Sequence, residues 1–219
     1  MSTALLVRRE AAADRRTVEI LVRDAFWNVY QPGATEHAVL HRLREDAAFI
    51  PELSLVAVLD GTIAGHVAGV RGVIHGRDGR DRSVITLGPI AVRPDLQRQG
   101  IGRALISRFI EVARSLQAPA VLLCGDPDYY GRLGFSPAER FGICTADRFY
   151  ADALQALELH PGALEGAGGR YVEAPVFSSL TEDEIEAFDR NFEPREKLCD
   201  TPSQRRLLEI VARARPAED

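Results

Sequence analysis

The chain has 219 residues, of which 46% are hydrophobic and 27% are charged, values that are ordinary for a globular protein. Its 27 Lys and Arg residues against 32 Asp and Glu residues give a net charge of −5, which argues against non-specific nucleic-acid binding. We therefore expect no nucleic-acid partner. No apolar run approaches the roughly 20 residues that span a bilayer, so we expect no membrane partner either. Cys124, Cys144 and Cys199 are odd in number and far apart, which argues against a disulfide framework and favours a cytoplasmic location.

The first half of the chain predicts helices followed by antiparallel strands. Apolar residues at helical spacing follow Asp14, a plausible N-cap, and a second helical pattern begins at Thr35 or Glu36. The dipeptide Asp60-Gly61 between two apolar runs predicts a hairpin. The predicted elements are a strand over 5–8, helices over 14–26 and 35–47, and strands over 53–59, 63–74 and 84–92, the last interrupted at Gly88-Pro89.

The second half predicts a strand–helix–strand crossover and a mixed tail. The crossover helix carries Leu105, Phe109, Val112 and Leu116 on one face and leads to a strand over 120–124. Further elements are a helical turn over 129–133, strands over 153–159 and 170–176, a helix over 181–188 with a capping box at Thr181 and Glu184, and a final helix over 203–214. The whole pattern is α+β, with a mostly antiparallel early sheet followed by the crossover.

A glycine-containing loop stands at the start of the crossover helix. It reads Gln97-Arg98-Gln99-Gly100-Ile101-Gly102-Arg103-Ala104. Glycines let the backbone approach a ligand, free N–H groups at a helix start favour an anion, and the two arginines add positive charge. The loop therefore indicates a phosphate or pyrophosphate site, with an ordinary helix start as the alternative. It lacks the Gly-Lys-Ser/Thr of a P-loop, and Leu105 stands where a Rossmann fingerprint requires Gly or Ala.

A second motif, one helix and one strand later, makes the first one more specific. Gln97, Gly100 and Gly102 match the acetyl-CoA loop signature of the GNAT acetyltransferases, Gln/Arg-x-x-Gly-x-Gly/Ala. Tyr130, Gly134 and Phe135 match the Tyr-x-x-x-Gly-Phe that this family commonly carries next. The chain thus resembles GNAT proteins, in particular their YhbS-like branch, firmly over residues 5–140 and more weakly in the tail.

The resemblance implies the GNAT acyl-CoA N-acyltransferase fold. This is an α/β/α sandwich whose mixed, twisted sheet has splayed central parallel strands, here residues 84–92 and 120–124. Residues 1–177 would form the N-acetyltransferase domain, and residues 178–219 a C-terminal helical extension packed on it. Acetyl-CoA is implied as co-substrate, bound along its pantetheine arm by Ile90, Ala91 and Val92 and at its pyrophosphate by Gln97, Arg98, Gln99, Gly100, Ile101, Gly102, Arg103 and Ala104.

The implied reaction is direct attack of a primary amine on the thioester of acetyl-CoA. A backbone N–H near Ile90 would stabilise the oxyanion, helped by a bulge at Gly88-Pro89 that opens the strand. Tyr130 matches the family's tyrosine and would be the general acid, because a phenol with a pKa of ~10 is protonated at neutral pH. The alternative for Tyr130 is a core aromatic residue whose hydroxyl makes a hydrogen bond.

The base that accepts the amine proton is left open by the sequence. Glu36, His37 and Asp126 are candidates for it or for substrate binding, and a water chain to solvent is another route. Cys124, at the end of strand 120–124, suggests a covalent acetyl-cysteine route as a lesser alternative to its being a small buried residue. We expect no metal, because the remaining histidines lack metal-ligand spacing; these are His41, His66, His75 and His160.

Other functions remain open on the same motifs. One is a non-catalytic GNAT-fold module that senses acyl-CoA, and another is a transferase with a different acyl donor or acceptor. The expected partner is a small-molecule or protein amine, to which acidic residues near the N-terminal helices, such as Glu36 and Glu45, offer charge attraction or only a solvated face. A homodimer is a further expectation from the family.

Overall fold

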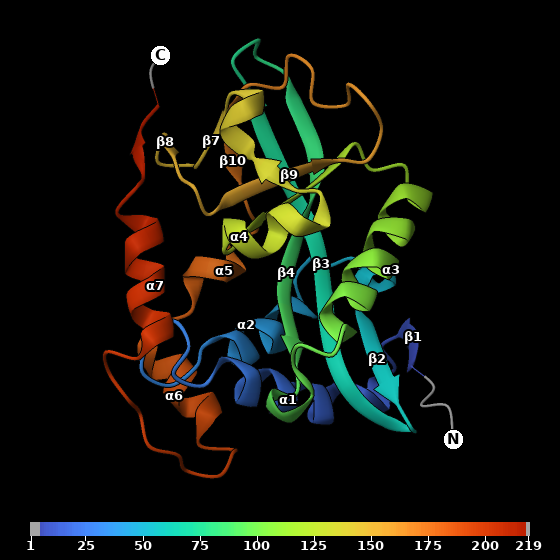
Figure 1. The fold of residues 1–219 in the computed structure, drawn as a ribbon, viewed down its shortest axis with the longest axis vertical. Helices are drawn as coiled ribbons and strands as arrows, with labels where there is room; N and C mark the ends of the chain where they lie inside the picture. The colour runs from blue at the N-terminus through green and yellow to red at the C-terminus, as the bar shows by residue number, and fades with distance from the viewer. Residues whose placement is uncertain (1–4, 218–219) are drawn as a thin grey trace. The chain divides into compact units, whose positions relative to one another are not determined.

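The computed structural model describes residues 5–217 and divides them into two units, each with its own core. The first unit comprises residues 5–69, 88–109 and 175–204, and the second comprises residues 70–87, 110–174 and 205–217. Strands β3 (Thr62–Gly76) and β4 (Asp81–Val92) and helix α3 (Ile101–Ser115), which are labelled in Figure 1, contribute residues to both units. Residues 1–4 and 218–219, which the predicted domain boundaries include, lie outside the described residues.

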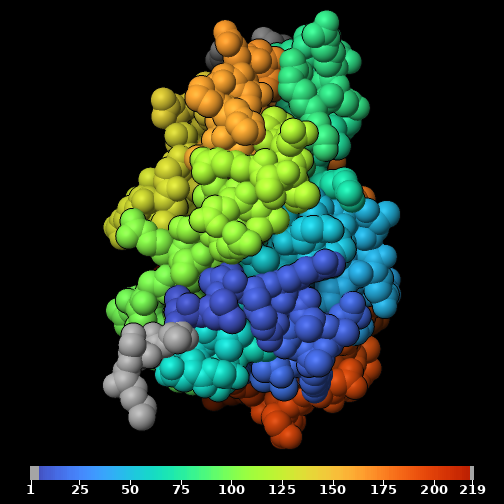
Figure 2. Space-filling view, turned by 90° about the vertical axis from the view of Figure 1, so that its right-hand side faces the viewer, coloured from blue at the N-terminus to red at the C-terminus, as the bar shows by residue number. Residues whose placement is uncertain are grey.

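The sheet of the first unit is an antiparallel meander, as predicted. β1 (Leu5–Arg9) pairs with β2 (Leu55–Leu59), with Val7 opposite Ala57, and β2 pairs with β3, with Leu55 opposite Val67. Asp60 and Gly61 join β2 to β3 with φ of 49° and 80°, the left-handed conformations that a two-residue hairpin turn requires. β1 is largely exposed, and the blue N-terminal segment faces the viewer in Figure 2.

Two N-terminal helices pack on each other in this unit. α1 (Arg15–Phe26) buries Val18, Leu21 and Val22, and α2 (Glu36–Leu43) buries Leu40 and Leu43. α2 ends four residues earlier than the predicted helix over 35–47, because the chain turns there and Asp46 accepts the N–H of Ala48.

Asp14 stands at the N-cap position of α1 but does not cap it. Its carboxylate instead accepts the N–H of Ala11 at 2.7 Å and a hydrogen bond from Arg8 at 2.6 Å. The predicted capping role is therefore wrong, since a short 3₁₀ turn over Ala12–Asp14 precedes the helix and engages the side chain.

The C-terminal part of the first unit is docked rather than solvated. α5 (Val176–Ser179) begins where the strand predicted over 170–176 was expected to end. α6 (Glu182–Asp189) starts at the predicted capping box, in which Thr181 accepts the N–H of Glu184 at 3.3 Å. Asp189 at the end of α6 accepts a 2.6 Å hydrogen bond from Arg23 of α1, so this helix is joined to α1 although it has no buried residue.

The second unit contains the crossover strands and is a mixed sheet. β4 pairs in parallel with β5 (Ala120–Cys124), with Ile85 opposite Val121, and β5 pairs antiparallel with β9 (Leu154–Glu158). β10 (Gly169–Val172) pairs antiparallel with β3. The remaining elements with residues in this unit are α4 (Pro127–Tyr130), β6 (Ser136–Pro137), β7 (Ile143–Cys144), β8 (Phe149–Tyr150), α7 (Pro202–Val211) and β11 (Arg215–Pro216).

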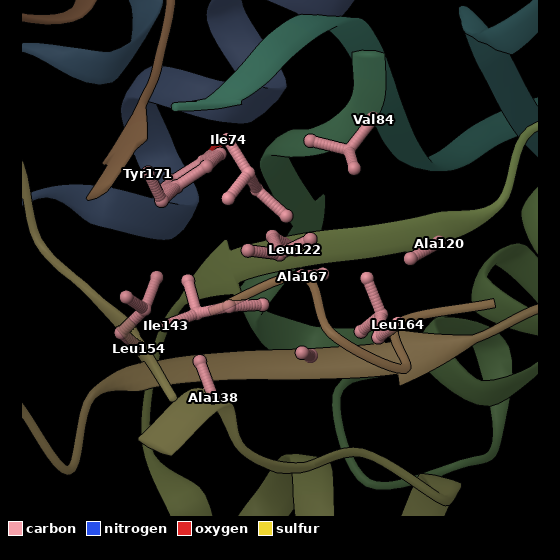
Figure 3. Packing of buried hydrophobic residues seen from close by; sticks show 11 residues of the cluster. Ile74, Val84, Ala120, Leu122, Ala138, Ile143, Leu154, Leu164, Ala167 and Tyr171 are labelled. Carbon is pink, nitrogen blue, oxygen red and sulfur yellow. The ribbon is translucent and has the colours of Figure 1, made fainter. Parts of the chain in front are cut away.

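The core of the second unit surrounds β5. Leu122 of β5 is fully buried among apolar side chains from β7, β9 and β10, including Ile143, Leu154 and Tyr171 (Figure 3). The hydroxyl of Tyr171 lies 2.5 Å from that of Thr86, which ties β10 to β4 inside this core. Short 3₁₀ helices complete the chain at Pro51–Leu53, Pro94–Leu96, Gly131–Leu133 and Ala138–Phe141.

Helix α3 buries one face at an interval of four residues. Ile101, Leu105, Phe109 and Ala113 form this face, whereas Leu116 is 43% exposed. The prediction that Leu116 continues the buried face is wrong, because α3 ends at Ser115 and Leu116 lies in the following turn.

β4 runs unbroken through Gly88-Pro89, where an interruption was expected. Within residues 5–217 no helix has both the length and the apolar character needed to cross a membrane.

Candidate active site

The glycine-containing loop adopts a conformation that opens its backbone toward solvent. After the 3₁₀ turn over Pro94–Leu96, Arg98 and Gly100 take left-handed φ values of 61° and 89°. A Cβ at Gly100 would meet no atom within 4 Å, so the space above the loop is open. The glycine is required by its φ, since other residues reach this conformation only at a cost.

The start of α3 presents unpaired amides beside two arginines. The helical hydrogen bonds begin with Ala104 N–H to Gly100 O at 3.0 Å, so the N–H groups of Ile101, Gly102 and Arg103 precede the helical pattern. Arg98 and Arg103 are exposed, and none of the residues 5–217 pairs with either guanidinium. Free amides, the helix dipole and two uncompensated positive charges would favour the binding of an anion at this loop.

The surroundings of the loop hold it in place. Gln97 donates to the carbonyl of Val92 at 3.2 Å, and Arg93 forms a bidentate pair with Asp95 at 3.0 and 2.6 Å. Gly65 of β3 lets α3 approach closely, because a Cβ there would stand 2.9 Å from the Ala91 carbonyl and 3.0 Å from Leu105. The loop is therefore supported on its protein side and open on the other.

Tyr130 lies in the second unit, on the short helix that follows β5. Its side chain is 9% exposed, and its ring makes edge contacts with Tyr129 and Phe135 at centroid distances of 5.0 and 5.7 Å. A Cβ at Gly125 would overlap the Tyr130 ring, so this ring packs directly on the backbone of Gly125. Gly134 ends the segment with a φ of 93°, as its place in the motif requires.

Asp126 lies close to Tyr130, whose N–H donates to its carbonyl, but the Asp126 carboxylate is engaged in structural hydrogen bonds. Its carboxylate caps α4 by accepting the N–H of Asp128 at 2.9 Å, and it accepts two hydrogen bonds from Arg206 at 3.0 and 3.2 Å. The Arg206 guanidinium is the main reason that the pKa of Asp126 lies below its ordinary value. A carboxylate so occupied is a weak base, which argues against the catalytic role expected for Asp126.

Glu36 and His37 lie on α2 in the first unit, and the structure does not make them an accessible pair. His37 is fully buried, with Nε2 3.1 Å from Asp189 Oδ1 and its ring in contact with both Phe188 and Phe192. Burial lowers the pKa of His37 to about 4, so it is neutral at pH 7. Glu36 accepts the N–H of Thr35 at 3.0 Å, and desolvation raises its pKa. His37 is thus a core residue rather than a base in contact with substrate.

Cys124 is the last residue of β5, and its thiol feels the negative charge of Glu173, a residue that the sequence did not single out. Solvent reaches the Cys124 side chain, yet surrounding protein atoms desolvate the thiol and, with the negative charge of Glu173, raise its pKa to about 12. A thiol with this pKa is protonated at neutral pH, which argues against the covalent acetyl-cysteine route. Glu173 went unnoticed because it lay inside the strand predicted over 170–176, while β10 in fact ends at Val172. Within residues 5–217 no three metal-ligating side chains gather.

The family model described as "Acetyltransferase (GNAT) family" matches residues 18–135, which is more than half of the chain. Two Escherichia coli K12 proteins named as uncharacterized N-acetyltransferases are similar in sequence. YhbS is 29% identical over 166 residues, covering 75% of this chain and 93% of YhbS. YjhQ is 35% identical over 118 residues, covering 54% of this chain and 61% of YjhQ.

Solved structures agree with the sequence matches. The crystal structure of Escherichia coli YhbS in complex with CoA has a TM-score of 0.73 and 27% identity, covering 83% of this chain and 96% of that one. A GNAT acetyltransferase from Brucella melitensis in complex with acetyl-CoA has a TM-score of 0.64 and 27% identity, covering 80% and 99%. The fold, both motifs and these matches agree: the chain belongs to the GNAT acetyltransferase family, among its YhbS-like members.

Proposed function

We propose that this protein transfers the acetyl group of acetyl-CoA to a primary amine by direct attack. The observation that carries the proposal is the anion site at the start of α3, where free amides and the unpaired Arg98 and Arg103 surround an open space. Two structural relatives, from Escherichia coli and Brucella melitensis, hold CoA and acetyl-CoA.

The loop fits the pyrophosphate of acetyl-CoA in charge and in shape. The amides of Ile101, Gly102 and Arg103 would donate to phosphate oxygens, and the helix dipole adds to the attraction. Gly100 has no side chain that could enter the phosphate volume, and the space beside it is open. Ile90 and Val92 at the end of β4 are half-buried around the buried Ala91, and their backbone would bind the pantetheine arm.

The chemistry would need a donor for the oxyanion and a proton for the leaving group. A backbone N–H near Ile90 would hold the carbonyl oxygen as negative charge develops on it. The lone pair of the neutral amine forms a bond to the carbonyl carbon, the carbon–sulfur bond breaks, and the thiolate takes a proton from the Tyr130 hydroxyl. The new amide nitrogen then loses its extra proton, which restores the phenol. The rigid packing of the Tyr130 ring on Gly125 supports this role, because a proton donor must be held in one orientation.

The experiment that tests the proposal has two steps. Calorimetry measures acetyl-CoA binding, and release of free CoA thiol is then followed against a panel of primary amines. We expect binding and amine-dependent thiol release. If the folded protein binds no acetyl-CoA, the proposed function is wrong. Binding without thiol release on any amine would favour a module that senses acyl-CoA. Faster thiol release from a longer acyl-CoA than from acetyl-CoA would indicate that the longer acyl-CoA is the donor.

A further inference from the structure

We propose that Arg206 is a positioning residue for the acetyl transfer, because its guanidinium holds the first turn of α4 and thereby the Tyr130 phenol. The inference rests on the proposed function, in which Tyr130 gives its proton to the thiolate. It gives the C-terminal segment over residues 205–217 a role in the reaction. The argument comes from the second unit alone, to which this segment and α4 both belong.

α4 is a single helical turn of four residues, and Tyr130 is its last residue. A helix this short is not stable by itself in water, because its few hydrogen bonds do not offset the cost of forming the first turn. Asp126 holds the start of the turn, since its carbonyl accepts the N–H groups of Tyr129 and Tyr130 at 3.1 Å each. The orientation of the phenol therefore depends on how firmly Asp126 is fixed.

Arg206 of α7 fixes the side chain of Asp126. Its Nε donates to Asp126 Oδ2 at 3.0 Å and its Nη2 donates to Asp126 Oδ1 at 3.2 Å, so the guanidinium binds the carboxylate in a bidentate manner. The same Oδ1 accepts the N–H of Asp128 at 2.9 Å and thereby caps α4. Arg206 thus holds the oxygen on which the cap of this helix depends.

A third hydrogen bond from the same guanidinium reaches further along the turn. Nη2 of Arg206 also donates to Asp128 Oδ2 at 2.6 Å. One cation therefore joins the carboxylates of Asp126 and Asp128, which would otherwise repel each other across the first turn of α4. Loss of Arg206 should leave both carboxylates without this attraction and the turn less rigid.

The far end of the C-terminal segment is attached to the second unit at a different place. β11 pairs with β8, with Arg215 opposite Tyr150, and the N–H of Ala217 donates to the carbonyl of Arg148 at 2.8 Å. Arg215 also forms an ion pair with Glu139. Because these attachments do not involve Arg206, its substitution should loosen α4 without detaching the segment.

The exposure of the Arg206 contacts separates a positioning role from a role in folding. The side chains of Arg206 and Asp126 are 32% and 37% exposed. Exposed ion pairs contribute little to stability, because solvent screens them. We therefore expect the contacts of Arg206 to affect the orientation of the α4 turn more than the stability of the protein.

The Arg206→Gln variant first tests the contact with α4 without any turnover. Hydrogen–deuterium exchange followed by mass spectrometry should show exchange about two- to tenfold faster in a peptide over residues 126–131, whose amides bond to Asp126. Arg215→Gln is the matched control, because this arginine of the same segment pairs with Glu139, and it should leave the exchange of that peptide unchanged. Wild-type exchange of the peptide in Arg206→Gln would overturn the inference.

Kinetics then test the effect on the reaction. In Arg206→Gln we expect kcat for thiol release to fall about tenfold, whereas KM for acetyl-CoA and the urea midpoint of unfolding stay close to the wild-type values. In a Tyr130→Phe background the same substitution should lower kcat no further, because the hydroxyl that Arg206 positions is absent. An unchanged kcat in Arg206→Gln, or an equal fold-loss with and without the Tyr130 hydroxyl, overturns this inference alone. A wild-type protein that neither binds acetyl-CoA nor releases thiol overturns the proposed function, and the inference falls with it.

Discussion

The aromatic ring of Tyr130 rests directly on the backbone of Gly125, five residues before it in the chain. A methyl group at Gly125 would overlap this ring. Gly125 also links β5 to α4, and its N–H donates to the carbonyl of Ala153 at 2.9 Å. The glycine therefore fixes both the path of the chain and the orientation of the phenol.

The first prediction is that Gly125→Ala displaces the Tyr130 ring. Overpacking at such a site costs about 1–3 kcal/mol of unfolding free energy, and turnover should fall even where the protein remains folded. Urea unfolding and thiol release measure the two effects. Gly131→Ala is the matched control, because a Cβ there meets nothing within 4 Å and its φ of −56° suits alanine. Equal behaviour of the two variants would contradict the packing argument.

The second prediction concerns the hydroxyl of Tyr130. Tyr130→Phe keeps the ring and its packing on Gly125, so the protein should still fold. Loss of a general acid typically lowers turnover by about 10²–10⁴-fold, while calorimetry should show unchanged acetyl-CoA affinity. The comparison must use conditions in which the chemical step limits the rate. Equal turnover of the two proteins there would assign Tyr130 to the core alone.

Local patterns predicted the loop, the hairpin and the capping box because each depends on neighbours in sequence. Asp60-Gly61 forms the expected turn, and Thr181 caps α6 as predicted. The pairs that join distant parts of the chain could not be read in this way. Arg206 pairs with Asp126 and Arg23 with Asp189, separations of 80 and 166 residues that no periodicity encodes.

One missed feature did leave a signal. Phe188 and Phe192 are four residues apart at the end of the predicted helix over 181–188, a spacing that indicates one apolar face. In the structure the His37 ring contacts both of them. Their spacing was a reason to expect a docked segment, although the position of His37 opposite them follows only from the tertiary fold.

The third prediction tests the arginines of the anion site. Replacing Arg98 or Arg103 removes one exposed charge and should weaken acetyl-CoA binding about three- to tenfold, since 1.4 kcal/mol corresponds to tenfold. Arg103→Gln preserves the helix and is the cleaner variant, and Arg108→Gln on the same helix is its control. Calorimetry at low and high ionic strength should show a weaker salt dependence for Arg103→Gln. An unchanged affinity would place the phosphates elsewhere.

The fourth prediction is a pH dependence of stability that arises from His37. Its pKa is lowered from 6.5 to about 4 in the folded protein, chiefly by burial, so the unfolded chain binds the proton more readily. Stability from the neutral imidazole is therefore full above pH 6.5 and is lost as the pH falls toward 4, with a slope approaching 1.4 kcal/mol per pH unit. His66, buried and lowered to about 4 as well, adds a similar slope in the same window.

His37→Gln isolates the contribution of this one group. Glutamine does not titrate, so the variant should be less stable at pH 7 but should lose less stability on acidification than the wild type. Urea unfolding between pH 7 and 4.5 measures both slopes. If His37→Gln retains the full wild-type slope, the buried imidazole is not the group whose protonation destabilises the fold, and His66 must carry the dependence.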